Sequence, residues 1–276
     1  MIKKAIILFI TLVMASCFLC GCNEKNSRYG NVYEITEFLK DDVYGRYMND
    51  DGKIFTRLQD FKSKLENSSD FTFYAYDNNF IEVINEEIPE TCLVNYGSDY
   101  VGESKYEIDN ESISAVEAIQ VSKNYFDLFP AEIAEGRGLE DSDFVNSDNF
   151  PVLLGNAYKD HFKVGDSFKG YYVTERKTFT VIGFIETDHS FYLKSKNSLD
   201  SYDNYLVVPF IEVEDSSFFS RIILLQGVCG FIESSEDRNV IAQTINEYLK
   251  EADLEKLVGM IVINKSSIKD KLNGNR

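Results

Sequence analysis

The sequence predicts an α+β protein in which a β-rich segment is inserted into a unit built from strands and helices. Two observations lead to this prediction. Both ends of the chain combine strand patterns with a helical repeat of apolar positions, whereas residues 138–215 show short strand patterns separated by turns. The 276 residues are 44% hydrophobic and 27% charged, as in a folded globular protein. We therefore expect residues 32–137 and 216–276 to form one unit around the insertion.

The first 22 residues have the layout of a secretory signal, with Lys3 and Lys4 before an apolar stretch. The stretch ends in LCGC at residues 19–22, which is similar to a bacterial lipobox. We expect cleavage before Cys22 and a diacylglycerol on its sulfur, because two acyl chains anchor a protein stably. An uncleaved single-pass helix, or an ordinary cleaved signal, remains an alternative. A lipid anchor or a retained helix would place the rest of the chain on the extracytoplasmic face of the cell membrane, with residues 23–31 as a tether.

The first part of the unit shows strand and helix patterns in alternation. Apolar residues recur at helical spacing over residues 56–66, after a turn signal at 49–52. A short helical turn over 122–129 follows the last strand of this part, with Ser122 as its expected N-cap. The expected strands of this part cover residues 32–38, 71–76 and 115–121.

The insertion and the second part of the unit also show helix and strand patterns. Residues 235–251 form the best helix pattern in the chain, with Val240, Ile241, Ile245, Tyr248 and Leu249 on one face. The residues just before this helix, 222–232, have a strand-like apolar pattern. The other expected strands cover residues 152–154, 167–173, 178–185, 205–208 and 258–263.

Charge and cysteine content limit the possible partners. With 28 basic and 46 acidic residues the net charge is −18, which disfavours nucleic acid and anionic lipid head groups as partners. Cys92 and Cys229 are the two cysteines outside the signal segment. They could pair in an oxidising compartment, but two buried free thiols are the interpretation that we favour.

Motifs for catalysis are sparse. The two histidines, His161 and His189, have no metal-ligand spacing, and nucleophile-elbow, phosphate-loop and dinucleotide motifs are lacking. The acidic residues at 140–143 lack the glycine and the final glutamate of an EF-hand loop. We therefore expect no catalytic residues, no metal and no cofactor. The competing hypothesis is an extracytoplasmic lipoprotein that acts as an enzyme or binds carbohydrate through its many acids and aromatics.

Several short motifs occur in a fixed order over residues 114–210. VSKNYF at 121–126 is followed by Gly136-Arg137 and then by Asp143. Further motifs are PVLL at 151–154, VGDSF at 164–168, FTVIGFI at 179–185 and YLVVP at 205–209. In this order they resemble the MacB-like periplasmic core domain of FtsX-like ABC transporter permeases.

The resemblance implies a porter-like strand–helix–strand subdomain with a β-rich insertion outside the membrane, which couples transport to protein partners in a permease–ATPase complex. No apolar stretch of membrane-spanning length follows the matched region, so transport activity is not implied for this sequence alone. The chain is then expected to be a stand-alone accessory lipoprotein, or a truncated permease remnant.

The motif residues have structural roles in this interpretation. Tyr125 and Phe126 are expected to anchor the helical turn in the core. Gly136 and Gly138 permit a tight chain reversal into the insertion. Arg137 is expected to form a two-pronged contact with a carboxylate such as that of Asp143. The remaining motif positions mark turns and strands and are Gly165, Gly183 and Pro209.

Overall fold

The structure is a computed structural model that describes residues 31–40, 43–49, 52–194, 196–265 and 268. The expected signal segment with Cys22 therefore lies outside the described residues, as does the expected tether except Asn31, which begins the first strand. The strands are β1 (Asn31–Leu39), β2 (Thr72–Ile84), β3 (Lys105–Ile108), β4 (Glu111–Val121), β5 (Ile133–Gly136), β6 (Asn149–Leu154), β7 (Ser167–Tyr172), β8 (Glu175–Ile185), β9 (Ser190–Leu193), β10 (Ser198–Ser201), β11 (Leu206–Pro209), β12 (Gly230–Ser234) and β13 (Val258–Asn264). The α-helices are α2 (Val43–Asn49), α3 (Lys53–Glu66), α4 (Tyr125–Leu128), α5 (Phe218–Gln226) and α6 (Arg238–Glu251). Short 3-10 helices are η1 (Glu90–Cys92), η2 (Val101–Ser104), η3 (Asp141–Phe144), η4 (Asn156–Tyr158) and η5 (Tyr202–Asn204).

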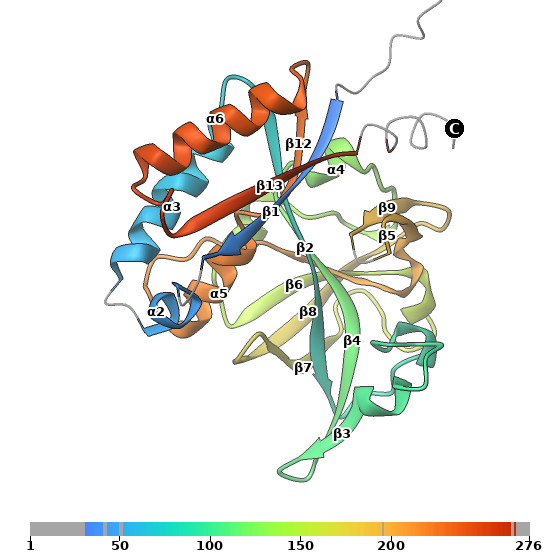
Figure 1. The fold of residues 1–276 in the computed structure, drawn as a ribbon. Coiled ribbons are helices and arrows are strands. Elements are labelled where there is room, and N and C mark those ends of the chain that lie inside the picture. Colours follow the sequence, from blue (N-terminus) through green and yellow to red (C-terminus); the bar gives the residue numbers. More distant parts are fainter. Residues whose placement is uncertain (1–30, 41–42, 50–51, 195, 266–267, 269–276) are drawn as a thin grey trace, which may run out of the picture.

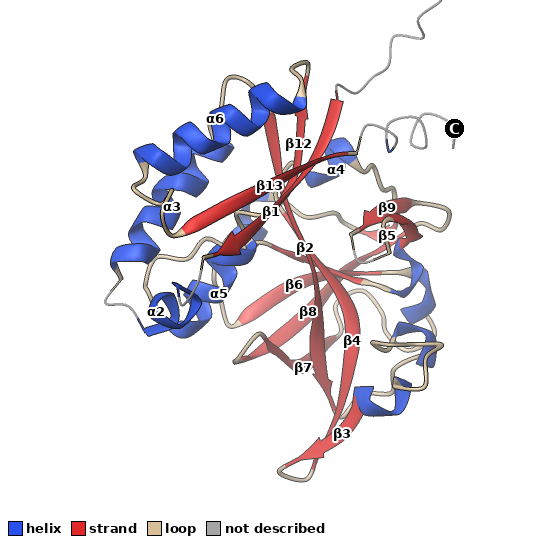
Figure 2. Ribbon diagram, in the orientation of Figure 1, coloured by secondary structure: helices blue, strands red, loops and turns tan. Residues whose placement is uncertain are grey.

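One long strand, β2, belongs to both halves of the molecule (Figure 1). Its first residues, up to Ala75, pair with β12, and its later residues, from Tyr76 on, pair with β4. Strands β13, β1, β12 and β2 form an antiparallel sheet, and helices α3 and α6 lie against it (Figure 2). This arrangement is the mixed α+β class that the sequence predicts.

The other half is a closed ring of strands. β2 pairs with β7 as well as with β4, and the pairing continues through β8, β6 and β11 back to β4. A ring of hydrogen-bonded strands is a small barrel, which leaves few free edges. The barrel takes β2 and β4 from before Gly138 and four strands from after it. Strand pairing thus crosses the expected boundary between residues 137 and 138, and the division into 32–137, 138–215 and 216–276 stays a prediction.

The expected helices form because apolar side chains recur on one face. In α3 the buried side chains are Ile54, Phe55, Leu58, Phe61 and Leu65. In α6 the Asp237 side chain accepts hydrogen bonds from the N–H groups of Asn239 and Val240, which begins the helix later than residue 235. The face of α6 is buried through Ile241, Ile245 and Leu249, whereas Val240 is exposed.

The strand prediction for residues 222–232 is wrong over its first half. Residues Phe218–Gln226 form helix α5, because the Ser217 hydroxyl accepts a hydrogen bond from the Ser220 N–H (3.2 Å) and caps the helix. Helix α5 is buried on several sides, and Ile223 and Leu224 are nearly inaccessible to solvent. A helix buried in this way has a continuous apolar run, which resembles the pattern of a buried strand. Only the second half, from Gly230, is strand, as β12.

The expected N-cap role of Ser122 is also corrected. Helix α4 begins only at Tyr125, after Asn124, and no side chain caps it. The Ser122 hydroxyl donates instead to Asn124 Oδ1 (2.7 Å). The Ser122 carbonyl, not its hydroxyl, accepts the Tyr125 N–H (3.1 Å), so the segment makes a turn before it becomes helical.

Candidate partner groove

A groove lies where α3, the β2–β4 crossing and the segment after β11 meet. Its first pocket, of about 360 Å³, has a floor of three buried aromatic rings from three parts of the chain, Phe73, Phe144 and Phe210. Its other lining residues are Lys62, Glu66, Ala75, Ser122, Lys123, Asn124 and Glu212. Since the floor is apolar and the rim is charged, the pocket can hold an apolar side chain between polar contacts.

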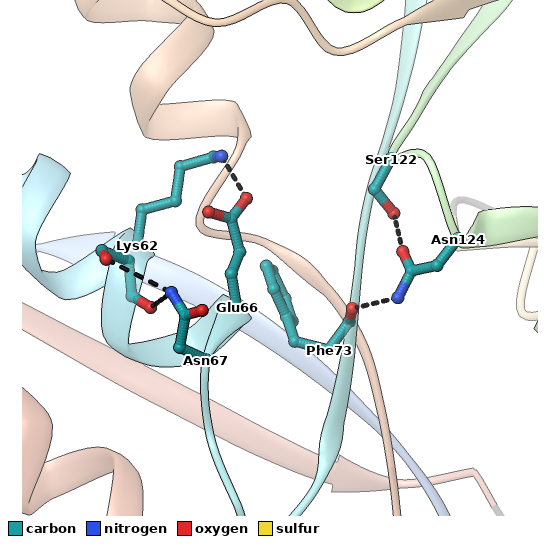
Figure 3. A network of polar contacts seen from close by, with 7 residues as sticks. Lys62, Glu66, Asn67, Phe73, Ser122 and Asn124 are labelled. Carbon is teal, nitrogen blue, oxygen red and sulfur yellow. Dashed lines mark hydrogen bonds and ion pairs between the residues drawn. The ribbon is translucent and has the colours of Figure 1, made fainter. Parts of the chain in front are cut away.

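Backbone pairing fixes one side of this pocket. The Phe210 N–H donates to Val121 O (2.9 Å), and the Ser122 N–H donates to Ala75 O (3.0 Å). The Asn124 side-chain amide donates to Phe73 O (2.9 Å) and accepts the Ser122 hydroxyl, as Figure 3 shows. On the other side Lys62 and Glu66 of α3 form an ion pair (Figure 3). Phe73 therefore lies between two polar networks.

The Phe144 side of the pocket is held by Arg137 and Asp143. The guanidinium donates to both carboxylate oxygens of Asp143, at 2.6 and 3.0 Å, which is the two-pronged contact that the sequence predicts. Asp143 also accepts the Glu140 N–H (2.8 Å) and so stabilises the start of η3. Burial alone would raise the pKa of Asp143, but the hydrogen bonds from Arg137 and Glu140 and the guanidinium charge lower it. A charged Asp143 thus holds η3, and with it Phe144, in place.

Two further pockets continue the first one along the segment after β11. One, of about 230 Å³, shares Lys62, Glu66, Phe210 and Glu212 with the first pocket. The other, of about 380 Å³, shares Glu212 and Glu214 with the second and adds Asp215. We call the three pockets together the partner groove. Its charged lining is mainly acidic.

The remaining motif residues belong to the core, to a turn and to strand ends. Tyr125 is fully buried and stacks on Tyr76 with ring centroids 5.5 Å apart, and Phe126 packs against the same cluster. Gly165 stands in the turn before β7, and Pro209 ends β11 next to Val121 of β4.

Gly136 and Gly183 form a close backbone contact between β5 and β8. Gly136 has φ +79°, and a Cβ there would lie 2.3 Å from Ile182 O. A Cβ on Gly183 would lie 2.5 Å from Arg137 O. Both positions therefore require glycine. Gly138, which the sequence also placed in the reversal, has neither a positive φ nor a close contact, so its expected role is not supported.

Sequence reasoning missed the α3 side of the partner groove. Lys62 and Glu66 are four residues apart on the predicted helix, a spacing that allows an ion pair. The spacing does not indicate which other part of the chain lies opposite this ion pair. Phe210 directly follows Pro209, the last residue of the YLVVP motif, so the motif ended one residue before Phe210 and did not include it.

The other candidate residues lie apart from the partner groove. Cys92 and Cys229 are both buried and free, so they do not pair. His161 is exposed, and His189 is partly exposed directly after a turn. Over the described ranges there is no group of three or more side chains that could hold a metal ion.

The fold and the partner groove define a mixed α+β module, and comparison with known proteins shows the family to which it belongs. The family model of the MacB-like periplasmic core domain matches residues 31–247, so the chain belongs to this family, which is found in transporter permeases. The recognition made from the motifs is thereby confirmed. The family also agrees with an extracytoplasmic location. No curated protein matches the chain.

Two solved structures are similar to this chain. The periplasmic region of MacB from Actinobacillus actinomycetemcomitans is 17% identical, with 91% of this chain and 97% of that chain covered and a TM-score of 0.44. The extracellular domain of the noncanonic ABC-type transporter YknZ from Gram-positive bacteria is 10% identical, with 84% of this chain and 100% of that chain covered and a TM-score of 0.39.

No helix in the described residues is both long enough and apolar enough to span a bilayer.

Proposed function

We propose that the chain acts as a non-catalytic domain of an ABC transporter permease-type system, outside the cytoplasm, and that it binds a protein partner in the partner groove. The observation that carries this proposal is the family match over residues 31–247, because part of the matched motif region, Ser122 to Asn124, lines the groove. Ser122 and Asn124 form one wall, and the Arg137–Asp143 pair holds another.

The chemistry of the partner groove favours a basic partner segment with an apolar anchor. The rings of Phe73, Phe144 and Phe210 offer an apolar floor. Glu212 and Glu214 are exposed on the rim, and in the described part of the chain neither forms an ion pair. Because the whole chain carries a net charge of −18, its field would attract a basic partner over a distance.

The partner groove is tested by capture from solubilised membranes of the source cells. A photo-crosslinking residue replaces Lys123 at the groove or, as the control, Glu107 on the exposed β3. We expect the Lys123 position alone to capture a permease or ATPase component, and the Glu212→Lys/Glu214→Lys variant to lose this product. Capture of no transporter component from the Lys123 position would count against the proposal.

We further propose that a lipid on Cys22 attaches the chain to the membrane. The support is the lipobox-like sequence at residues 19–22. In cells fed a labelled fatty acid, the wild-type chain should carry label and stay in the membrane fraction. The Cys22→Ala variant should carry none. An unlabelled wild-type chain with an intact N-terminus by mass spectrometry would instead support a retained helix.

A further inference from the structure

A second site lies away from the partner groove, at the place where β2 changes partners. Pairing of β2 with β12 ends at Ala75, and pairing with β7 begins only at Glu82. Asp77 lies on this stretch of β2 and lines a pocket of about 460 Å³. Glu37 of β1 and Cys229 line it as well, and residues of α2 and α5 complete the lining.

The pocket contains more negative than positive charge. Glu37 and Asp77 form no ion pair within the described part of the chain, and Glu37 Oε2 is buried without a hydrogen-bond partner there. The Lys194 ammonium lines the pocket but donates to Tyr76 O (3.1 Å). Glu34, a third carboxylate in the lining, is paired with Lys265 at 3.2 Å. Two carboxylates thus face one ammonium.

Buried polar groups around Asp77 also lack partners. Gln120 is 0% exposed, and neither its amide nitrogen nor its amide oxygen has a hydrogen-bond partner in the described residues. Gln120 pairs directly with Asp77 across β4 and β2, so both side chains stand on the same face of the sheet. Gln226 Oε1, in the pocket lining, is equally unpartnered. Native structures leave few buried polar groups unpaired. The unpartnered oxygens in the pocket lining, Glu37 Oε2 and Gln226 Oε1, are hydrogen-bond acceptors, so they point to a polar ligand that donates hydrogen bonds.

We propose that this pocket binds a small organic cation, with an ammonium or guanidinium group on a short aliphatic chain. The cationic group would balance the excess carboxylate and donate to Glu37 and Asp77. The walls contributed by Met48, Ile222 and Leu225 suit an aliphatic chain, and the half-exposed Tyr44 ring suits a cation–π contact. The pocket volume of about 460 Å³ lies in the usual range for small-molecule sites. This site is independent of the partner groove.

Calorimetric titration of the purified full-length chain in detergent tests the proposal, with agmatine, cadaverine and spermidine as probes. At about 0.15 M NaCl we expect saturable binding of at least one probe with a Kd below roughly 1 mM. The variants Asp77→Asn and Glu37→Gln should each weaken binding by about tenfold or more. Glu107→Gln, which removes an exposed carboxylate on β3, should leave binding unchanged.

Three results would overturn the proposal. They are no saturable binding of any probe, equal binding by the wild type and Asp77→Asn, and equal binding of the uncharged 1,5-pentanediol. Asparagine matches the shape of aspartate, so Asp77→Asn should fold, and its thermal unfolding curve verifies this independently of binding.

Discussion

Arg137 and Asp143 form a two-pronged ion pair, with nitrogen–oxygen distances of 2.6 and 3.0 Å, in which the carboxylate is buried and the guanidinium is partly exposed. The pair joins the end of β5 to η3 and so fixes Phe144 in the floor of the partner groove. The asymmetry in exposure means that the two residues should not respond equally to substitution.

Replacing Arg137 should destabilise the protein more than its own exposure suggests. Arg137→Ala leaves the Asp143 carboxylate, 8% exposed, without its charged partner. We expect a loss of about 1–3 kcal/mol in the free energy of unfolding, measured by urea denaturation. Arg176→Ala is a matched control, because Arg176 makes a similar two-pronged contact with Glu111 at a more exposed site. Equal losses in the two variants would contradict the argument from burial.

The same pair predicts an acid-sensitive contribution to stability. The pKa of Asp143 is lower in the folded protein than in the unfolded chain, so folding is favoured by deprotonation of this group. Its stabilising contribution is present above about pH 4 and is lost as the pH falls through the folded pKa. Asp143→Asn should therefore lose less stability than the wild type between about pH 5 and pH 3 in urea titrations. Parallel pH profiles would show that the pair contributes nothing through this carboxylate.

Gly136 allows a prediction that separates steric from conformational effects. Gly136 and Gly97 both have φ +79°, but only at Gly136 would a Cβ meet backbone atoms, the nearest at 2.3 Å. Gly97→Ala should cost about 1 kcal/mol, from the backbone conformation alone. Gly136→Ala should cost at least about 2 kcal/mol, because β5 must also move away from β8. Thermal unfolding of both variants measures the difference, and similar losses would mean that the close contact relaxes freely.

The sequence was informative where structure is local. The helical spacing of Phe55, Leu58 and Leu65 predicted α3, and the short helical turn predicted over residues 122–129 contains α4. The strand prediction for residues 222–225 was wrong because a short apolar run is equally typical of a strand and of a buried helix. The cap at Ser217, which decides between them, is a weak signal on its own.

Long-range pairing is what the sequence could not predict. The strand expected at 71–76 continues to Ile84, although Asp77, Asn78 and Asn79 are poor strand residues. These polar positions are held in the strand by β4, whose residues 118–120 pair with them. The barrel closure and the meeting of Lys62 with Ser122 depend on the same kind of contact between distant parts of the chain, which no local pattern encodes.

The two cysteines give a chemical test of the core. Cys92 and Cys229 are buried and free, and burial raises the pKa of the Cys229 thiol to about 11. A buried thiol with a raised pKa reacts slowly, because the thiolate is the nucleophile. Iodoacetamide should label neither residue in the native protein and both after unfolding without a reductant, as measured by peptide mass spectrometry. A disulfide-linked peptide pair would contradict the structure.

Asp77 predicts a substitution that stabilises the protein. Burial raises the pKa of Asp77 to about 6, although the Lys194 charge and the Asn78 N–H act in the opposite direction. A carboxyl group whose pKa is higher in the folded state than in the unfolded chain makes stability fall as the pH rises from about 4 to about 6, after which its effect is constant. Asp77→Asn removes this charge, so the variant should be more stable than the wild type by about 1–3 kcal/mol at pH 7.5 in amine-free buffer. The advantage should shrink toward zero near pH 4, because Asp77 is then neutral in both states. Urea denaturation across this pH range checks the prediction, with Glu107→Gln as the exposed control. The compared quantity is the difference in unfolding free energy between Asp77→Asn and the wild type. If this difference is the same at pH 7.5 and at pH 4, solvent reaches the Asp77 carboxylate and the prediction is wrong.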